Sequence, residues 1–123
     1  MEALELVPIF LPENITVFCL DWAGCGLSEG KYISLGWWER EDLAIIVDHL
    51  REKRRVSTIG LWGRSMGAST ALLYSQRDPS IAGMVLDSPF SNLNRIVDEL
   101  AQQYTSIPSF LINIAKRMVA SSV

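Results

Sequence analysis

A serine framed by glycines is the part of this sequence best suited to chemistry. Residues 63–67 read Gly-Arg-Ser-Met-Gly, so Ser65 has a glycine two positions away on each side. This G-x-S-x-G pattern is typical of a serine on a sharp strand-to-helix turn, from which the hydroxyl can attack a carbonyl carbon. The backbone N–H of Met66, next after the serine, would stabilise the negative oxygen formed by that attack. The chemistry expected is acyl transfer from an ester, thioester or peptide.

The residues on either side of Ser65 fit such a turn. The β-rich run at 56–62, VSTIGLW, predicts a strand, and Met66–Gln76 predicts a helix directly after the serine. A strained turn leaves no room for side chains two positions from the serine, so glycine is expected at both Gly63 and Gly67. The alternative interpretation is an ordinary helix-capping serine in a glycine-rich turn.

The other elements alternate between strands and helices. The apolar run Ile15–Leu20 predicts a strand buried on both faces of a parallel sheet, and Ile81–Leu86 predicts another. Helices are expected over Glu2–Phe10, Trp38–Arg54, Asn92–Gln103 and Ser109–Ala120. Alternating strands and helices predict an α/β fold with a parallel sheet, in a single domain over residues 1–123.

Composition excludes several classes of function. The 123 residues are 49% hydrophobic and 20% charged with a net charge of −3, so we expect one folded domain without a basic surface for nucleic acid or anionic membranes. No apolar run approaches the ~20 residues of a membrane span, and residues 1–10 have no basic segment of a signal peptide. Cys19 and Cys25 fit neither a disulfide framework nor a metal motif, which predicts reduced thiols in a cytosolic protein. No cofactor or metal is expected, and the expected partner is a small acyl or peptide substrate. A nucleotide-binding domain is disfavoured because no G-K-[ST] occurs and no G-x-G-x-x-G joins a strand to a helix.

Three segments resemble the α/β-hydrolase superfamily, in particular its serine aminopeptidase and monoacylglycerol-lipase-like branch. They are FCLDWAGCGLSEG (18–30), IGLWGRSMGAS (59–69) and IAGMVLDSPFSNL (81–93). They look like the loop after the family's fourth strand, its fifth strand with the nucleophile turn, and its sixth strand, in family order. The resemblance implies a partial, three-layered α/β-hydrolase fold with three recognisable strands, Ser65 as nucleophile and Met66 as oxyanion donor. It also implies that the chain corresponds to the middle of such a hydrolase and that residues 109–120 begin a cap.

A nucleophilic serine needs a base, and the chain has one histidine, His49. The family takes its acid and histidine from later strands and a second oxyanion donor from an earlier loop, and the resemblance assigns none of these here. His49 lies near the end of the helix expected at 38–54, which runs antiparallel to the strands. A strand of about seven residues would separate it from Ser65 by about 23 Å. We therefore expect His49 on the helix surface and hydrolysis impaired in this chain alone. The alternatives are a non-catalytic binding module or an incomplete gene product.

Several other polar residues near the expected site have structural interpretations. Asp87 ends a strand at the same edge as Ser65 and is interpreted as a loop or cap aspartate, although some hydrolases take their acid from this place. Asp21 is expected to hydrogen-bond the backbone of its glycine loop, and Arg64 to be solvated. The aromatic residues after that loop either line an acyl pocket or, as we favour, pack the helix start on the core. These are Tyr32, Trp37 and Trp38.

The expected sheet raises a question of pairing. In the superfamily the third strand lies between the fourth and the fifth. The strands expected at 15–20 and 56–62 would flank that position, and each buried backbone group left unpaired costs about 1–3 kcal/mol. Three outcomes are open: the two strands pair directly, another chain donates a strand, or the product does not fold alone.

Overall fold

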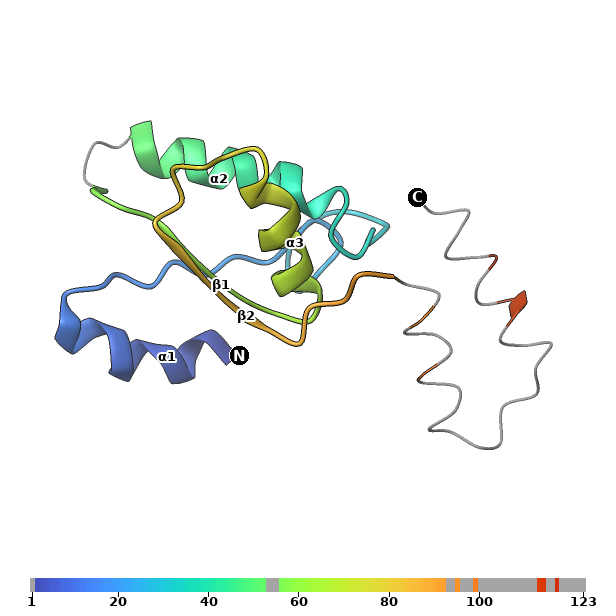
Figure 1. The fold of residues 1–123 in the computed structure, drawn as a ribbon, viewed down its shortest axis with the longest axis horizontal. Coiled ribbons are helices and arrows are strands. Elements are labelled where there is room, and N and C mark those ends of the chain that lie inside the picture. Colours follow the sequence, from blue (N-terminus) through green and yellow to red (C-terminus); the bar gives the residue numbers. More distant parts are fainter. Residues whose placement is uncertain are drawn as a thin grey trace.

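The computed structural model describes residues 2–52 and 56–92, together with the isolated residues 95, 99, 113, 114 and 117. In chain order, the elements are α1 (Glu2–Phe10), the 3-10 helix η1 (Leu11–Glu13), α2 (Glu39–Glu52), β1 (Gly60–Arg64), α3 (Met66–Ser75) and β2 (Gly83–Asp87). Helices α2 and α3 lie on one side of the sheet and α1 lies on the other (Figure 1). The three layers and the alternation confirm the α/β class. The helices expected over 92–103 and 109–120 fall almost wholly outside the described residues.

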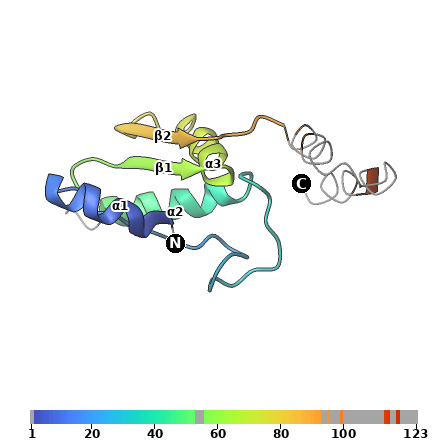
Figure 2. The ribbon, with the colours of Figure 1, turned by 90° about the horizontal axis from the view of Figure 1, so that it is seen from below.

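The sheet is a parallel pair whose carboxyl ends meet at one edge. Strands β1 and β2 lie side by side (Figure 2) and pair in register from Gly60 with Gly83 to Arg64 with Asp87. The Ser65 N–H extends the ladder by donating to the Asp87 carbonyl at 2.8 Å. Ser65 and Ser88, the residues that follow the two strands, therefore lie at the same edge of the sheet.

The strand expected at Ile15–Leu20 is not formed. The sheet of the described residues consists of β1 and β2 alone, so the prediction of three strands is wrong. Ile15 is 48% exposed and Phe18 is 51% exposed, so the predicted burial on both faces is also wrong. The segment runs extended on the far side of β1 from β2 (Figures 1 and 2), but no ladder joins it to β1. An apolar, β-rich run becomes a strand only when another backbone pairs with it. Direct pairing is thus not found within 2–52 and 56–92, and strand donation by another chain stays a prediction.

The hydrophobic core lies between α2, α3 and β1. Its buried members are Leu43 and Val47 of α2 and Tyr74 of α3. Ala68 and Ala71, which are 0% and 2% exposed, form the small face that brings α3 close to the sheet. Partly buried side chains surround this core: Trp22, Ala44, Ile59, Leu61 and Ile81. The core therefore fixes α3, and with it the turn at Ser65, against β1.

A polar cluster joins the ends of α2 and α3. The Asp78 carboxylate accepts a hydrogen bond from the Tyr74 hydroxyl at 2.7 Å and pairs with the Arg51 guanidinium at 2.8 Å. The hydrogen bonds from Arg51 and from the Ser80 hydroxyl lower the pKa of Asp78. Burial, followed by the bond to Asp78, raises the pKa of Tyr74 to about 12. The tyrosine consequently stays neutral and bonded at neutral pH, and it holds the two helices together.

The start of α2 is organised by a buried carboxylate. Glu39 is 3% exposed and accepts the backbone N–H groups of Ser34 and Gly36, each at 2.7 Å, together with the Ser34 hydroxyl. The Ser34 oxygen in turn accepts the Trp38 N–H at 2.6 Å. Burial raises the pKa of Glu39, but the hydrogen bonds together outweigh burial and lower it. The ionised carboxylate thus fixes the loop that precedes α2.

Replacing this carboxylate should destabilise the fold in a pH-dependent way. Glu39→Gln points an amide NH2 group at N–H donors, so we expect the free energy of unfolding to fall by roughly 1–3 kcal/mol at neutral pH. Because the native pKa is lowered, the stabilisation is present above the ordinary glutamate pKa of about 4.3 and is lost as the pH falls through the native value. Urea unfolding of both proteins should show their difference shrinking over that acidic range. Glu52→Gln, at an exposed position of the same helix, is the control, and an equal effect of the two variants at neutral pH would contradict the assignment.

Candidate functional site

Ser65 stands on a sharp turn between β1 and α3. Its backbone has φ 51° and ψ −113°, a conformation that costs a non-glycine residue about 1–3 kcal/mol. The residue is exposed, and its hydroxyl makes no capping bond to α3, which argues against the ordinary helix-capping interpretation. Its backbone is held on both sides, because the N–H donates to Asp87 and the carbonyl accepts the Ser69 N–H at 3.1 Å. The turn therefore presents a hydroxyl that makes no hydrogen bond to the described residues.

The two glycines around Ser65 differ in what they contribute. A Cβ on Gly63 would lie 2.3 Å from the carbonyl carbon of Gly67 and 2.5 Å from the Ala68 nitrogen. Those are backbone atoms, so Gly63 is required for α3 to pass this close to β1. A Cβ on Gly67 would meet nothing within 4 Å. The expectation that both glycines relieve a clash is correct for Gly63 and wrong for Gly67, because the contact runs from the strand into the helix backbone and not the reverse.

Charged side chains flank the serine at the edge of the sheet. Arg64 Nε lies 3.4 Å from Asp87 Oδ2, and the Ser88 hydroxyl donates to Asp87 Oδ1 at 2.8 Å. Arg64 is exposed, as expected for a solvated arginine, but it is also paired with the carboxylate of the neighbouring strand. Asp87 is consequently engaged by its own neighbours at the strand end, consistent with its interpretation as a loop aspartate.

The histidine lies away from this edge. His49 is exposed in the last turn of α2. Helix α2 runs opposite to the strands, so its last turn lies toward the start of β1, whereas Ser65 follows the end of β1 (Figure 1). The expectation of a surface histidine is confirmed, and the structure does not bring His49 and Ser65 together.

The glycine loop before α2 is built around Asp21. Its Oδ2 accepts the Leu27 N–H at 3.1 Å, and its carbonyl accepts the Ser28 hydroxyl at 2.8 Å. A Cβ on Gly26 would lie 2.2 Å from the same Oδ2, so glycine is needed at that position, which has φ 55°. The expected role of Asp21 in holding its own loop is therefore confirmed.

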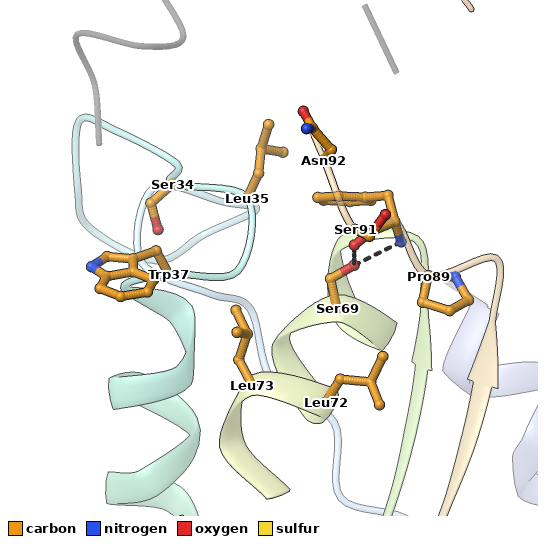
Figure 3. A pocket seen from close by; sticks show the side chains of 10 residues that line it. Ser34, Leu35, Trp37, Ser69, Leu72, Leu73, Pro89, Ser91 and Asn92 are labelled. Atoms are coloured by element: carbon orange, nitrogen blue, oxygen red, sulfur yellow. Dashed lines mark hydrogen bonds between the residues drawn. The ribbon is translucent and has the colours of Figure 1, made fainter. Parts of the chain in front are cut away.

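A pocket of about 490 Å³ lies on the flank of α3, and we call it the α3 pocket. Its wall comes from the loop before α2, one side of α3 and the segment after β2 (Figure 3). The lining residues are Ser34, Leu35, Trp37, Ser69, Leu72, Leu73, Pro89, Phe90, Ser91 and Asn92. Ser65 is not among them, but Ser69 is one helical turn further along α3. Its hydroxyl donates to the Phe90 carbonyl at 3.1 Å and accepts the Phe90 N–H at 3.0 Å, which closes one side of the pocket.

The aromatic residues after the glycine loop do not pack on the core. Tyr32 is 81% exposed and Trp38 is 60% exposed, so the favoured packing interpretation is wrong for both. Trp37 lines the α3 pocket, and the Arg40 guanidinium lies 3.7 Å from the centre of its ring. Ser69 and Phe90 were not identified from the sequence, where the only available signal was the position of Ser69 four residues after Ser65 on a helix.

Within 2–52 and 56–92, no group of three or more His, Cys, Asp or Glu side chains is arranged to hold a metal ion. Cys19 and Cys25 are free thiols. Among the helices of the described part of the chain, none has the length and apolar character needed to cross a bilayer.

The asymmetry between the glycines gives a matched pair of variants. Gly63→Ala places a methyl group against helix backbone and should lower the free energy of unfolding by roughly 1–3 kcal/mol. Gly67→Ala has open space and removes a glycine from a helix, so it should be neutral or stabilising by up to about 1 kcal/mol. Urea denaturation followed by circular dichroism measures both. Equal losses of stability in the two variants would contradict the described contact.

Comparison with known proteins places the chain in a family. The family model described as "Serine aminopeptidase, S33" matches residues 3–122. The chain is 35% identical over 94 residues to "Uncharacterized protein YqkD" of Bacillus subtilis (strain 168), covering 74% of this chain and 31% of that protein. The esterase Pf2001 of Pyrococcus furiosus superimposes with a TM-score of 0.75 at 28% identity, covering 93% of this chain and 46% of the esterase. The chain therefore spans less than half the length of either relative. With a partial α/β-hydrolase fold and a family match over nearly all of its residues, the chain belongs to the serine aminopeptidase (S33) family of the α/β-hydrolase superfamily.

Proposed function

We propose that Ser65 is the nucleophile of a serine hydrolase that cleaves acyl bonds, with esters as the favoured substrates. The observation that carries the proposal is the strained, exposed turn that leaves the Ser65 hydroxyl without a partner in the described chain. The side-chain oxygen of a capping serine would accept a hydrogen bond from an N–H group at the start of the helix, whereas that of a nucleophilic serine would not. Family membership supports hydrolysis in general, and the likeness to an esterase supports esters over peptides and thioesters.

The proposed reaction begins with attack by Ser65 Oγ on the substrate carbonyl carbon. A C–O bond forms to the serine, and the carbonyl π electrons move onto the oxygen. The Met66 N–H, at the first position of α3, donates to that oxygen, and the positive end of the helix dipole favours the same charge. Collapse of this intermediate expels the alcohol leaving group and leaves an acyl-serine, which water then hydrolyses.

The attack also requires a base that accepts the hydroxyl proton. His49, the chain's one histidine, lies in the last turn of α2, toward the start of β1, whereas Ser65 follows the end of β1 (Figure 1). Asp87 is held by Arg64 and Ser88. We therefore propose that this chain contributes the nucleophile and one oxyanion donor, and that its turnover is low by itself. Triad members act as a unit, and removing one typically lowers kcat by roughly 10⁴–10⁶.

Labelling with a fluorophosphonate probe tests the nucleophile. We expect slow labelling that Ser65→Ala abolishes. Ser88→Ala is the matched control, because Ser88 is also an exposed serine with φ 51° at the same sheet edge. It should label as the wild type does. His49→Ala should change the labelling rate less than about twofold, since a residue far outside the hydrogen-bond reach of about 3 Å cannot act as the base.

The same measurement separates this proposal from its alternative, a non-catalytic hydrolase-like binding module. A folded protein that never labels, or that labels equally with and without Ser65, would remove the nucleophile assignment and leave the binding module. A marked loss of labelling in His49→Ala would instead show that the histidine reaches Ser65, contrary to the geometry of α2.

A further inference from the structure

We propose that the α3 pocket binds the neutral hydrocarbon chain of the substrate ester, a proposal that rests on the function proposed for Ser65. The volume of about 490 Å³ falls within the ~300–1,000 Å³ of typical small-molecule sites. None of the ten lining residues carries a charge, so the described part of the chain offers the pocket no counter-ion for a carboxylate, phosphate or ammonium group. A neutral chain is the ligand that such a wall can desolvate without an unpaired charge.

Two of the polar residues in the wall are already satisfied by the protein. The Ser34 hydroxyl donates to Glu39 and accepts the Trp38 N–H. The Ser69 hydroxyl donates to and accepts from the backbone of Phe90 (Figure 3). Neither hydroxyl is left to recognise a polar ligand. The contacts that remain at these two walls are therefore made mainly by Leu35, Leu72, Leu73 and neighbouring apolar atoms.

The pocket lies close enough to Ser65 to serve the same substrate. Ser69 borders it and is bonded to Ser65 through its backbone N–H at 3.1 Å. Four residues of α-helix rise by about 6 Å. That is the length of a few methylene groups, so a hydrocarbon chain attached to a carbonyl at Ser65 is long enough to span the distance to Ser69 at the border of the pocket.

The outer wall is a tryptophan held by charge. Arg40 stacks on the Trp37 ring and also pairs with Glu41 at 3.2 Å, and Glu41 accepts from Arg77 of the neighbouring helix end at 2.7 Å. The hydrogen bond from Arg77 lowers the pKa of Glu41, so the chain of charges persists at neutral pH. A half-exposed indole is thereby kept beside the pocket and extends its apolar wall.

Binding of uncleavable ethers tests this pocket without any chemistry at Ser65. The probes are the ethyl, butyl and hexyl ethers of 4-nitrophenol, titrated into protein with labelled leucine methyl groups and followed by NMR. We expect the affinity to rise about three- to fourfold for each added methylene. The methyl signals of Leu35, Leu72 and Leu73 should shift, whereas those of the exposed Leu4 and Leu27 should not.

Variants distinguish binding in the α3 pocket from non-specific binding to apolar surface and from chemistry at Ser65. Leu72→Ser should weaken hexyl ether binding roughly tenfold, and Ile45→Ser, an exposed apolar position on α2, should not. Ser65→Ala should bind as the wild type does. Affinity that ignores chain length, shifts confined to Leu4 and Leu27, or equal effects of Leu72→Ser and Ile45→Ser would overturn the proposal. Ether binding without Ser65 labelling would overturn the function of Ser65 and leave a hydrocarbon-binding pocket. Ser65 labelling without ether binding would overturn the proposed pocket and leave the function of Ser65.

Discussion

The close approach of α3 to β1 is the constraint on which the rest of this structure depends. Because Gly63 has no side chain, the backbone of Gly67 can lie where it would otherwise clash with a Cβ at position 63. The chain between the two glycines must then reverse direction over one residue. Ser65 absorbs that reversal with φ 51°, at a cost of about 1–3 kcal/mol. Such strain persists only where the surrounding contacts hold the residue in place.

Those contacts come from both sides of the turn. On the sheet side, the bond from the Ser65 N–H to the Asp87 carbonyl adds one rung to the parallel ladder. On the helix side, Tyr74 is buried between α2 and α3 and bonded to Asp78, which is itself paired with Arg51. An ion pair thus joins the two helices at their C-terminal ends, and apolar side chains pack between them along their length. A net stability of only ~5–15 kcal/mol makes each of these contacts matter to the geometry of the serine.

Local patterns predicted several local features of this chain, and the failures other than that at Gly67 depend on contacts between segments distant in sequence. The turn at Ser65, the helix at Glu2–Phe10 and the role of Asp21 depend on residues within a few positions, and all three are found. The strand expected at Ile15–Leu20 is absent because its formation needs a partner backbone that its own residues cannot specify. The α3 pocket could not be predicted for the same reason, since three segments far apart in sequence close around it.

Ser65 and Ser88 have the same residue type and the same backbone strain, and they differ in their position relative to a helix. Both follow parallel strands at one edge, both are exposed and both have φ 51°. After Ser88, residues 89–92 form an irregular segment, and the Ser88 hydroxyl donates to Asp87 Oδ1. The chain after Ser65 enters α3 at once, so Met66 and the positive end of the helix dipole directly follow the serine, where the reaction we propose would develop negative charge. A strained serine that no helix follows differs from an ordinary serine only in its backbone. A strained serine at the start of a helix also lies in an electrostatic environment suited to an oxyanion.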